Sequence, residues 1–202
     1  SDVCSSDLEA IATEIESLGG SLDPYSGNHS FGLCTEVMRE DLHLGMDLFA
    51  DVLLNPEFAR TSVERERQVQ LAGIRGQRDQ LLQSALKAMR RRLFGERGYG
   101  LDSLGEEAVV SRLGADDVRR HYNRLVVPSN AVLSVFGDMD AEAVMGQLES
   151  RLGGWTGGTV FLPASEAYSL GTGLVEEERD KEQSVLVLGV PGTTFEIGRA
   201  HV

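Results

Sequence analysis

The sequence of 202 residues contains little of what most recognisable functional sites require. It has two cysteines, too few for a disulfide framework or a zinc-binding set of cysteines. Its four histidines occur in none of the H-x-x-x-H, H-E-x-x-H or H-x-x-E-H spacings of helical metal sites. No G-x-S-x-G nucleophile elbow or G-x-x-x-x-G-K-[ST] phosphate loop is present, and no apolar run approaches the roughly 18 residues of a membrane span.

Positive charge is also scarce. The sequence has 19 Lys and Arg residues and 32 Asp and Glu residues, which gives a net charge of −13. This balance argues against nucleic acid or an anionic membrane as the main partner, because binding to phosphate needs an excess of basic side chains. A hydrophobic content of 41% and a charged content of 25% are typical of a soluble globular protein. The length suits one large domain or two small ones.

The two ends of the chain share an unusual origin. Residues 1–8, SDVCSSDL, and residues 196–202, EIGRAHV, can be encoded by a single DNA sequence read on opposite strands. Such a pair is typical of a sequencing adapter translated at both edges of a DNA fragment. We therefore predict that both tails are artefacts and that the natural sequence lies within residues 9–195.

The first two thirds of this natural part predict a hairpin and six helices. Apolar residues at helical spacing precede Gly19-Gly20, and residues 21–38 alternate around Gly27-Asn28, a turn signal that indicates a β-hairpin. Helical spacing returns in the remaining segments, which cover residues 39–55, 61–80, 81–94, 105–113 and 114–125.

The last third changes character. Residues 130–138, NAVLSVFGD, form an apolar, β-branched run that predicts a strand buried on both faces. A helix is predicted over residues 140–155, a loop over 156–172, and strands over 173–180 and 182–192. We expect an α+β fold in which a mixed or antiparallel sheet carries helices packed on one face.

Chemistry-bearing residues have plain structural explanations. Glu64, Arg65, Glu66 and Arg67 suit a solvated helix face, with Glu64 and Arg67 at an i,i+3 spacing that supports the helix. We interpret Cys34 as a small buried hydrophobe. The scattered histidines are interpreted as surface or packing residues; within residues 9–195 they are His29, His43 and His121.

Six motifs, in order, resemble the pitrilysin/insulinase family of zinc metallopeptidases, which includes mitochondrial processing peptidase. They are IESLGGSLDPYSGNHSFGLCTEVMREDL, MDLFADVLLNPEF, VERERQVQLAGI, LFGERGYG, VPSNAVLSVFGDMD and DKEQSVLVLGVPG. The resemblance implies a processing-peptidase-like metallohydrolase unit, of which this chain is a truncated piece. It also implies two parts, residues 9–114 and residues 115–195, and a bacterial source in which the compartment, periplasm or cytoplasm, stays open.

The family binds zinc through two His residues of an H-x-x-E-H helix and a downstream Glu, while the Glu between the histidines acts as general base. In this chain the H-x-x-E-H would lie before Glu9. The segment VERERQVQLAGI resembles the downstream motif, with Glu66 at a supporting position and Gly73 seven residues later at the ligand position. Since glycine has no side chain, the resemblance implies that the third zinc ligand has been lost.

Members of the family work as pairs of similar units, one with zinc and one with a degenerate site that helps to bind substrate. The resemblance therefore implies that this chain belongs to the non-catalytic, substrate-clamping half and is inactive alone. Its implied partners are a peptide substrate and a homologous catalytic unit, in the same chain or a separate subunit. We assign no catalytic, cofactor-binding or metal-binding residue, and expect zinc only in the parent family.

Two alternatives stay open. One is a catalytic half whose ligand helix is shifted so that Glu64 or Glu66 binds the metal, with the H-x-x-E-H lost by truncation. The other is a structural relative, like the family-like core subunits of respiratory complexes.

Overall fold

A computed structural model describes residues 15–17, 19–27, 30–161 and 172–190, together with Thr13 and Gly192. The chain divides into two compact units. Unit 1 falls within Ser1–Val63 and Gly114–Pro163, and unit 2 within Glu64–Leu113 and Ala164–Val202. Both predicted adapter-like tails lie outside the described residues.

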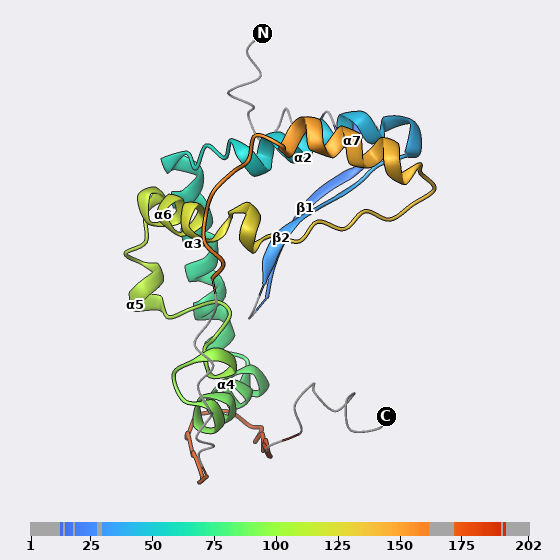
Figure 1. Ribbon diagram of the computed structural model, residues 1–202. Coiled ribbons are helices and arrows are strands. Elements are labelled where there is room, and N and C mark those ends of the chain that lie inside the picture. The colour runs from blue at the N-terminus through green and yellow to red at the C-terminus, as the bar shows by residue number, and fades with distance from the viewer. Residues whose placement is uncertain are drawn as a thin grey trace, which may run out of the picture. The chain divides into compact units, whose positions relative to one another are not determined.

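Unit 1 contains an antiparallel hairpin, as the alternating sequence predicts. Strand β1 (Ser21–Ser26) pairs with β2 (Phe31–Glu36), in a register that sets Ser21 opposite Glu36. The Gly27 N–H donates to the carbonyl of Ser30 over 2.8 Å and so closes the connection. Figure 1 shows this hairpin beside helix α2 (Leu42–Leu54), which packs on β2.

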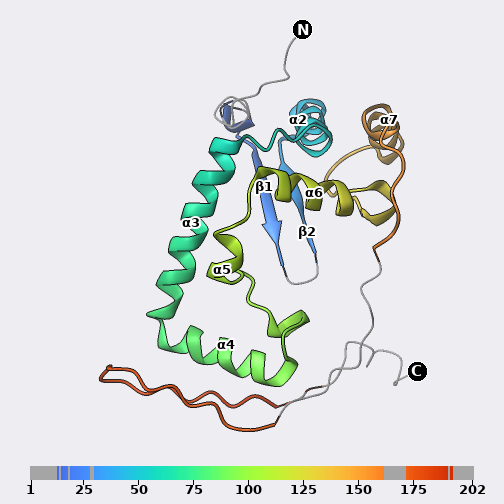
Figure 2. The same cartoon turned by 90° about the vertical axis from the view of Figure 1, so that its left-hand side faces the viewer.

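The helices of unit 1 come from both ends of its sequence. Helix α7 (Ala141–Leu152) packs along α2, and both views show the two helices side by side (Figures 1 and 2). The apolar side chains of Met46 and Leu48 on α2 and Val144 on α7 are buried. Further helical elements of this unit are η1 (Arg39–Asp41), α6 (Ala115–Leu125) and η3 (Pro128–Asn130).

Unit 2 is built on two long helices, α3 (Arg60–Arg78), whose first turn belongs to unit 1, and α4 (Leu81–Phe94) (Figure 2). One side of α3 is apolar: Leu71 and Ile74 are 4% and 3% exposed. They form a small core with Val110 and the partly buried Leu104. Two short elements follow α4, namely η2 (Gly98–Gly100) and α5 (Glu107–Val110).

All six helix predictions from residue 39 onward are confirmed, but three strand predictions are wrong. Residues 130–138, 173–180 and 182–192 form no strand where they are described. Val132 and Phe136 are 94% and 91% exposed, the opposite of a strand buried on both faces. A strand exists only where a neighbour pairs with its backbone, and the described sheet consists of β1 and β2 alone. The high apolar content of these segments does not by itself provide a second strand to pair with.

The architecture is α+β, with helices outnumbering strands and an antiparallel hairpin as the described sheet. Within the described residues, no helix is both long and apolar enough to cross a membrane.

Candidate functional site

Helix α3 carries Glu66 and Gly73, the two residues that align with the supporting and ligand positions of the family's zinc motif. Glu66 and Gly73 are two turns apart, so they lie on the same side of the helix. The buried side is formed by Leu71 and Ile74, whereas Glu66 and Gly73 are exposed. A Cβ built on Gly73 would meet no atom within 4 Å. Crowding by neighbouring atoms therefore does not explain why residue 73 is a glycine.

Glu64 is engaged by its own helix. Arg67 forms an ion pair with its Oε2, and the Gln68 side chain donates to its Oε1 over 2.8 Å. The hydrogen bond from Arg67 holds the pKa of Glu64 below its ordinary value, and the bond from Gln68 acts in the same direction. Glu66 forms an exposed ion pair with Arg65 at 3.3 Å. Both oxygens of Glu64 thus already accept hydrogen bonds, which confirms the predicted salt-bridged face.

The described histidines are surface residues, as predicted. His43 on α2 lies 3.0 Å from Asp47, measured from Nδ1 to Oδ2, and its side chain is 72% exposed. His121 on α6 is exposed, with its ring 6.3 Å from that of Phe31. His29 lies outside the described residues. Among the described residues, no three His, Cys, Asp or Glu side chains form a group that could hold a metal ion.

The interpretation of Cys34 as a buried hydrophobe is wrong, because this free thiol is exposed. Side chains alternate between the two faces of a strand, and α2 packs on β2. A two-stranded hairpin offers too few neighbours to cover every position of both faces.

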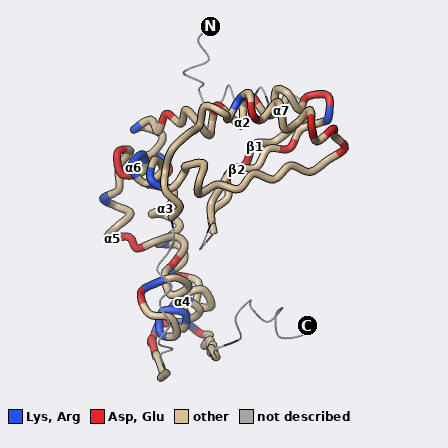
Figure 3. The backbone as a smooth tube through the Cα atoms, viewed as in Figure 1, with Lys and Arg blue, Asp and Glu red and all other residues tan. Residues whose placement is uncertain are grey.

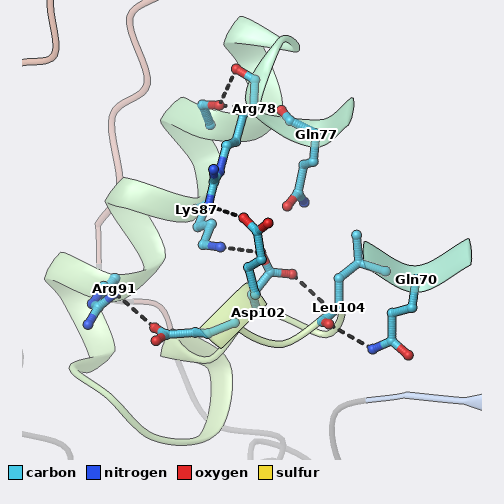
Figure 4. A network of polar contacts seen from close by, with 10 residues as sticks. Gln70, Gln77, Arg78, Lys87, Arg91, Asp102 and Leu104 are labelled. Atoms are coloured by element: carbon cyan, nitrogen blue, oxygen red, sulfur yellow. Dashed lines mark hydrogen bonds and ion pairs between the residues drawn. The ribbon is translucent and has the colours of Figure 1, made fainter. Parts of the chain in front are cut away.

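A polar network in unit 2 was not foreseen from the sequence (Figure 4). Glu107, at the start of α5, forms ion pairs of 2.8 Å with both Arg75 and Arg78 in the last turns of α3. The Gln70 amide donates to the carbonyl of Leu104 over 2.8 Å. These contacts fasten the connection after α4 to the polar side of α3, next to the core.

Asp102 fastens the same connection to α4. Its carboxylate lies 2.7 Å from the Lys87 ammonium and accepts the backbone N–H of Leu104 over 3.0 Å. Burial raises the pKa of Asp102, since its side chain is only 7% exposed, but the hydrogen bonds from Lys87 and Leu104 outweigh burial and leave this pKa below its ordinary value. Asp102 is therefore a structural anion rather than a proton donor at neutral pH.

Unit 1 has a shallow cavity of about 240 Å³ where η1 and α2 meet the start of α7. Arg39, one of its charged lining residues, forms an exposed ion pair with Asp138 at 2.7 Å. The carboxylate of Asp140 caps α7 by accepting the N–H groups of Glu142 and Ala143. Glu40 and His43 also line the cavity, and His43 pairs with Asp47 of its own helix.

Two protein-family models match the sequence of this chain. The family model "Insulinase (Peptidase family M16)" matches residues 5–105, half of the chain, and "Peptidase M16 inactive domain" matches residues 112–199. The chain belongs to the insulinase family, M16. The resemblance drawn from the six motifs is thereby confirmed.

Bacterial relatives agree with this membership in the insulinase family. An uncharacterized zinc protease of Mycobacterium leprae is 30% identical over 193 residues, covering 92% of this chain and 43% of the relative. One of Rickettsia bellii is 27% identical over 191 residues, covering 92% of this chain and 44% of the relative. This chain spans less than half the length of either relative.

Solved structures share the fold. An M16 inactive domain from Pseudomonas fluorescens superposes with a TM-score of 0.72 at 20% identity, covering 80% of this chain and 40% of that one. A protease from Helicobacter pylori gives 0.64 at 15% identity, with 80% and 38% coverage.

Replacing Gly73 by alanine should stabilise this member of the insulinase family. A glycine inside a helix costs about 1 kcal/mol relative to alanine, and the new methyl group would meet open space. We expect the free energy of unfolding, measured with urea, to rise by about 0.5–1 kcal/mol. Gly45→Ala is the control, since a Cβ there would lie 2.8 Å from the Val37 side chain and should bring no gain. A lower free energy of unfolding in Gly73→Ala would show that the added methyl group meets atoms that the structure does not place near position 73.

Proposed function

We propose that this chain is part of the non-catalytic, substrate-clamping half of a zinc metallopeptidase. The observation that carries the proposal is Gly73. It stands on an exposed helix face seven residues after Glu66, where the family-like motif would place a zinc ligand, and it offers no side chain. The match of residues 112–199 to the M16 inactive domain supports the same assignment.

The geometry of α3 weighs against Glu64 as the shifted ligand. Glu64 uses both carboxylate oxygens within its own helix, so binding a metal would require breaking the contacts with Arg67 and Gln68. Glu66 has only an exposed ion pair with Arg65 at 3.3 Å, so it stays open as a third ligand beside two His residues upstream.

The structural-subunit alternative has one supporting observation. A chain of Complex III2 from Candida albicans superposes with a TM-score of 0.59 at 18% identity. Identity this low speaks for the fold alone. A structural subunit is therefore the second candidate function. The partner that the protein binds, a catalytic peptidase unit or a structural complex, distinguishes it from the first.

The proposed organisation follows from the same relationship. We propose that residues 9–114 and 115–195 are two successive parts of the half-protein and that residues 1–8 and 196–202 are foreign tails; the change of family model between residues 105 and 112 supports a boundary there. Zinc would be held by the homologous catalytic unit. The role of this half would be to present a strand edge to an extended peptide.

A first test concerns metal. After dialysis against zinc and then against buffer, this chain should retain far less than one zinc ion per molecule, as should Gly73→Ala. Measurement by elemental analysis needs no enzyme activity. One tightly held zinc ion per chain would contradict assignment to the non-catalytic half.

A second test concerns the clamping role. The complete half-protein should cleave no peptide alone, yet should raise the kcat/KM of its catalytic partner on an unfolded peptide. A tenfold rise would correspond to about 1.4 kcal/mol of added transition-state binding. A partner that cuts equally well without it would remove the clamping role and favour the structural reading.

A further inference from the structure

The connection between α2 and α3 contains a strained residue. Phe58 has a backbone φ of 49°, and it is the one non-glycine residue with a positive φ in the described part of the chain. In this left-handed region the Cβ of a bulky residue crowds its own backbone. Such a conformation persists only where the surroundings hold it.

Helix α6 supplies the contacts that hold it. The ring of Tyr122 meets that of Phe58 edge to face, with centroids 5.2 Å apart and planes at 64°. The Tyr122 hydroxyl donates to the carbonyl of Leu53 over 2.6 Å, and the Arg119 guanidinium donates to the carbonyl of Glu57 over 3.0 Å. Two α6 side chains thus hold the end of α2 at Leu53 and the connection itself at Glu57 and Phe58.

The rest of the connection has little freedom. Asn55 ends α2, with its backbone N–H donating to Asp51 over 2.8 Å, and the ring of Pro56 fixes its own φ. The first α3 hydrogen bond runs from the Val63 N–H to the carbonyl of Ala59. The dihedrals of Phe58 therefore set the direction in which the first turn of α3 leaves α2.

We propose that residues 55–59 form a hinge and that Tyr122 and Arg119 of α6 are its latch. With the latch closed, Phe58 is kept left-handed and the start of α3 is fixed. With the latch open, Phe58 relaxes to a negative φ and the first turn of α3 takes another direction.

A pair of substitutions at the hinge tests the strain. Phe58→Gly and Phe58→Ala both remove the ring, but only glycine relieves a left-handed backbone. With Tyr122 and Arg119 intact, the glycine variant should have the higher midpoint of urea unfolding. With the latch removed by Tyr122→Leu and Arg119→Met, the order should reverse, because alanine is favoured over glycine once φ is negative. Alanine above glycine in the intact background, or no reversal, would overturn the proposal.

Hydrogen exchange gives a second readout that does not depend on the ring. The single variant Arg119→Met keeps the Tyr122 contacts, so it should stay folded while its Val63 amide, the first one bonded within α3, exchanges about 5- to 30-fold faster. Arg120→Met is the matched control on the same helix, since Arg120 pairs only with Asp117 in the described contacts. Equal exchange in the two variants would show that α6 does not hold the hinge.

Discussion

Replacing Ile74 by alanine should strongly destabilise unit 2. Ile74 is 3% exposed and shares its small core with Leu71, Val110 and Leu104. Truncation of a buried isoleucine to alanine costs about 2–5 kcal/mol, through lost burial and the cavity left behind. Because the total stability of a domain is only about 5–15 kcal/mol, this loss removes a large share of it and should clearly lower the urea midpoint.

Val69→Ala is the matched control for that experiment. It shortens another β-branched side chain on the same helix, but Val69 is 62% exposed. We expect its unfolding free energy to change by about 0.5 kcal/mol or less. Urea unfolding followed by circular dichroism measures both variants. Similar losses in the two would mean that the side of α3 facing Val110 is not the buried one.

The helices could be read from the sequence because their signals are local. In residues 81–94 the apolar spacing and the glycine at position 95, which has a φ of 72°, mark a helix whose observed bounds agree with the prediction. Glu64 and Arg67 meet for the same reason, since residues three apart are neighbours on any helix. The hairpin is local too, because its strands are joined by a short turn.

Sheet membership could not be read in this way. The run NAVLSVFGD has the composition of a buried strand, yet composition does not say which backbone would pair with it. Leu186 and Leu188 in the later run EQSVLVLGVPG are 90% and 87% exposed, so this segment also has an uncovered side. A strand depends on partners distant in sequence, and those partners decide whether the apolar side chains are buried.

The polar network was missed for a related reason. Glu107 is 32 residues from Arg75, and Asp102 is 15 residues from Lys87, so no helical spacing connects either pair. The available signal was compositional: the acidic residues of 102–107 follow the basic end of α4. Such a charge contrast suggests pairing, but only the turn at η2 brings the two segments together.

Replacing Asp102 by asparagine should weaken unit 2 at neutral pH and remove part of its acid sensitivity. Asparagine can still accept the N–H of Leu104, so the substitution isolates the ion pair with Lys87. The Lys87 side chain is 37% exposed, and screening by water limits the loss to about 1–2 kcal/mol. Glu96→Gln is the control: Glu96 pairs with Arg91 but is 74% exposed, so its loss should stay below about 0.5 kcal/mol.

The pH dependence of that difference follows from the lowered pKa of Asp102. A carboxyl that is more acidic in the folded state binds fewer protons there than in the unfolded chain, so its stabilisation is complete above the unfolded pKa, for which the ordinary value is 3.8. It is lost as the pH falls through the folded pKa. Urea midpoints measured between neutral pH and acid should therefore show a constant gap between the natural chain and Asp102→Asn down to about pH 5, narrowing below it. A gap that persists unchanged in acid would mean that the contact with Lys87 contributes through packing rather than charge.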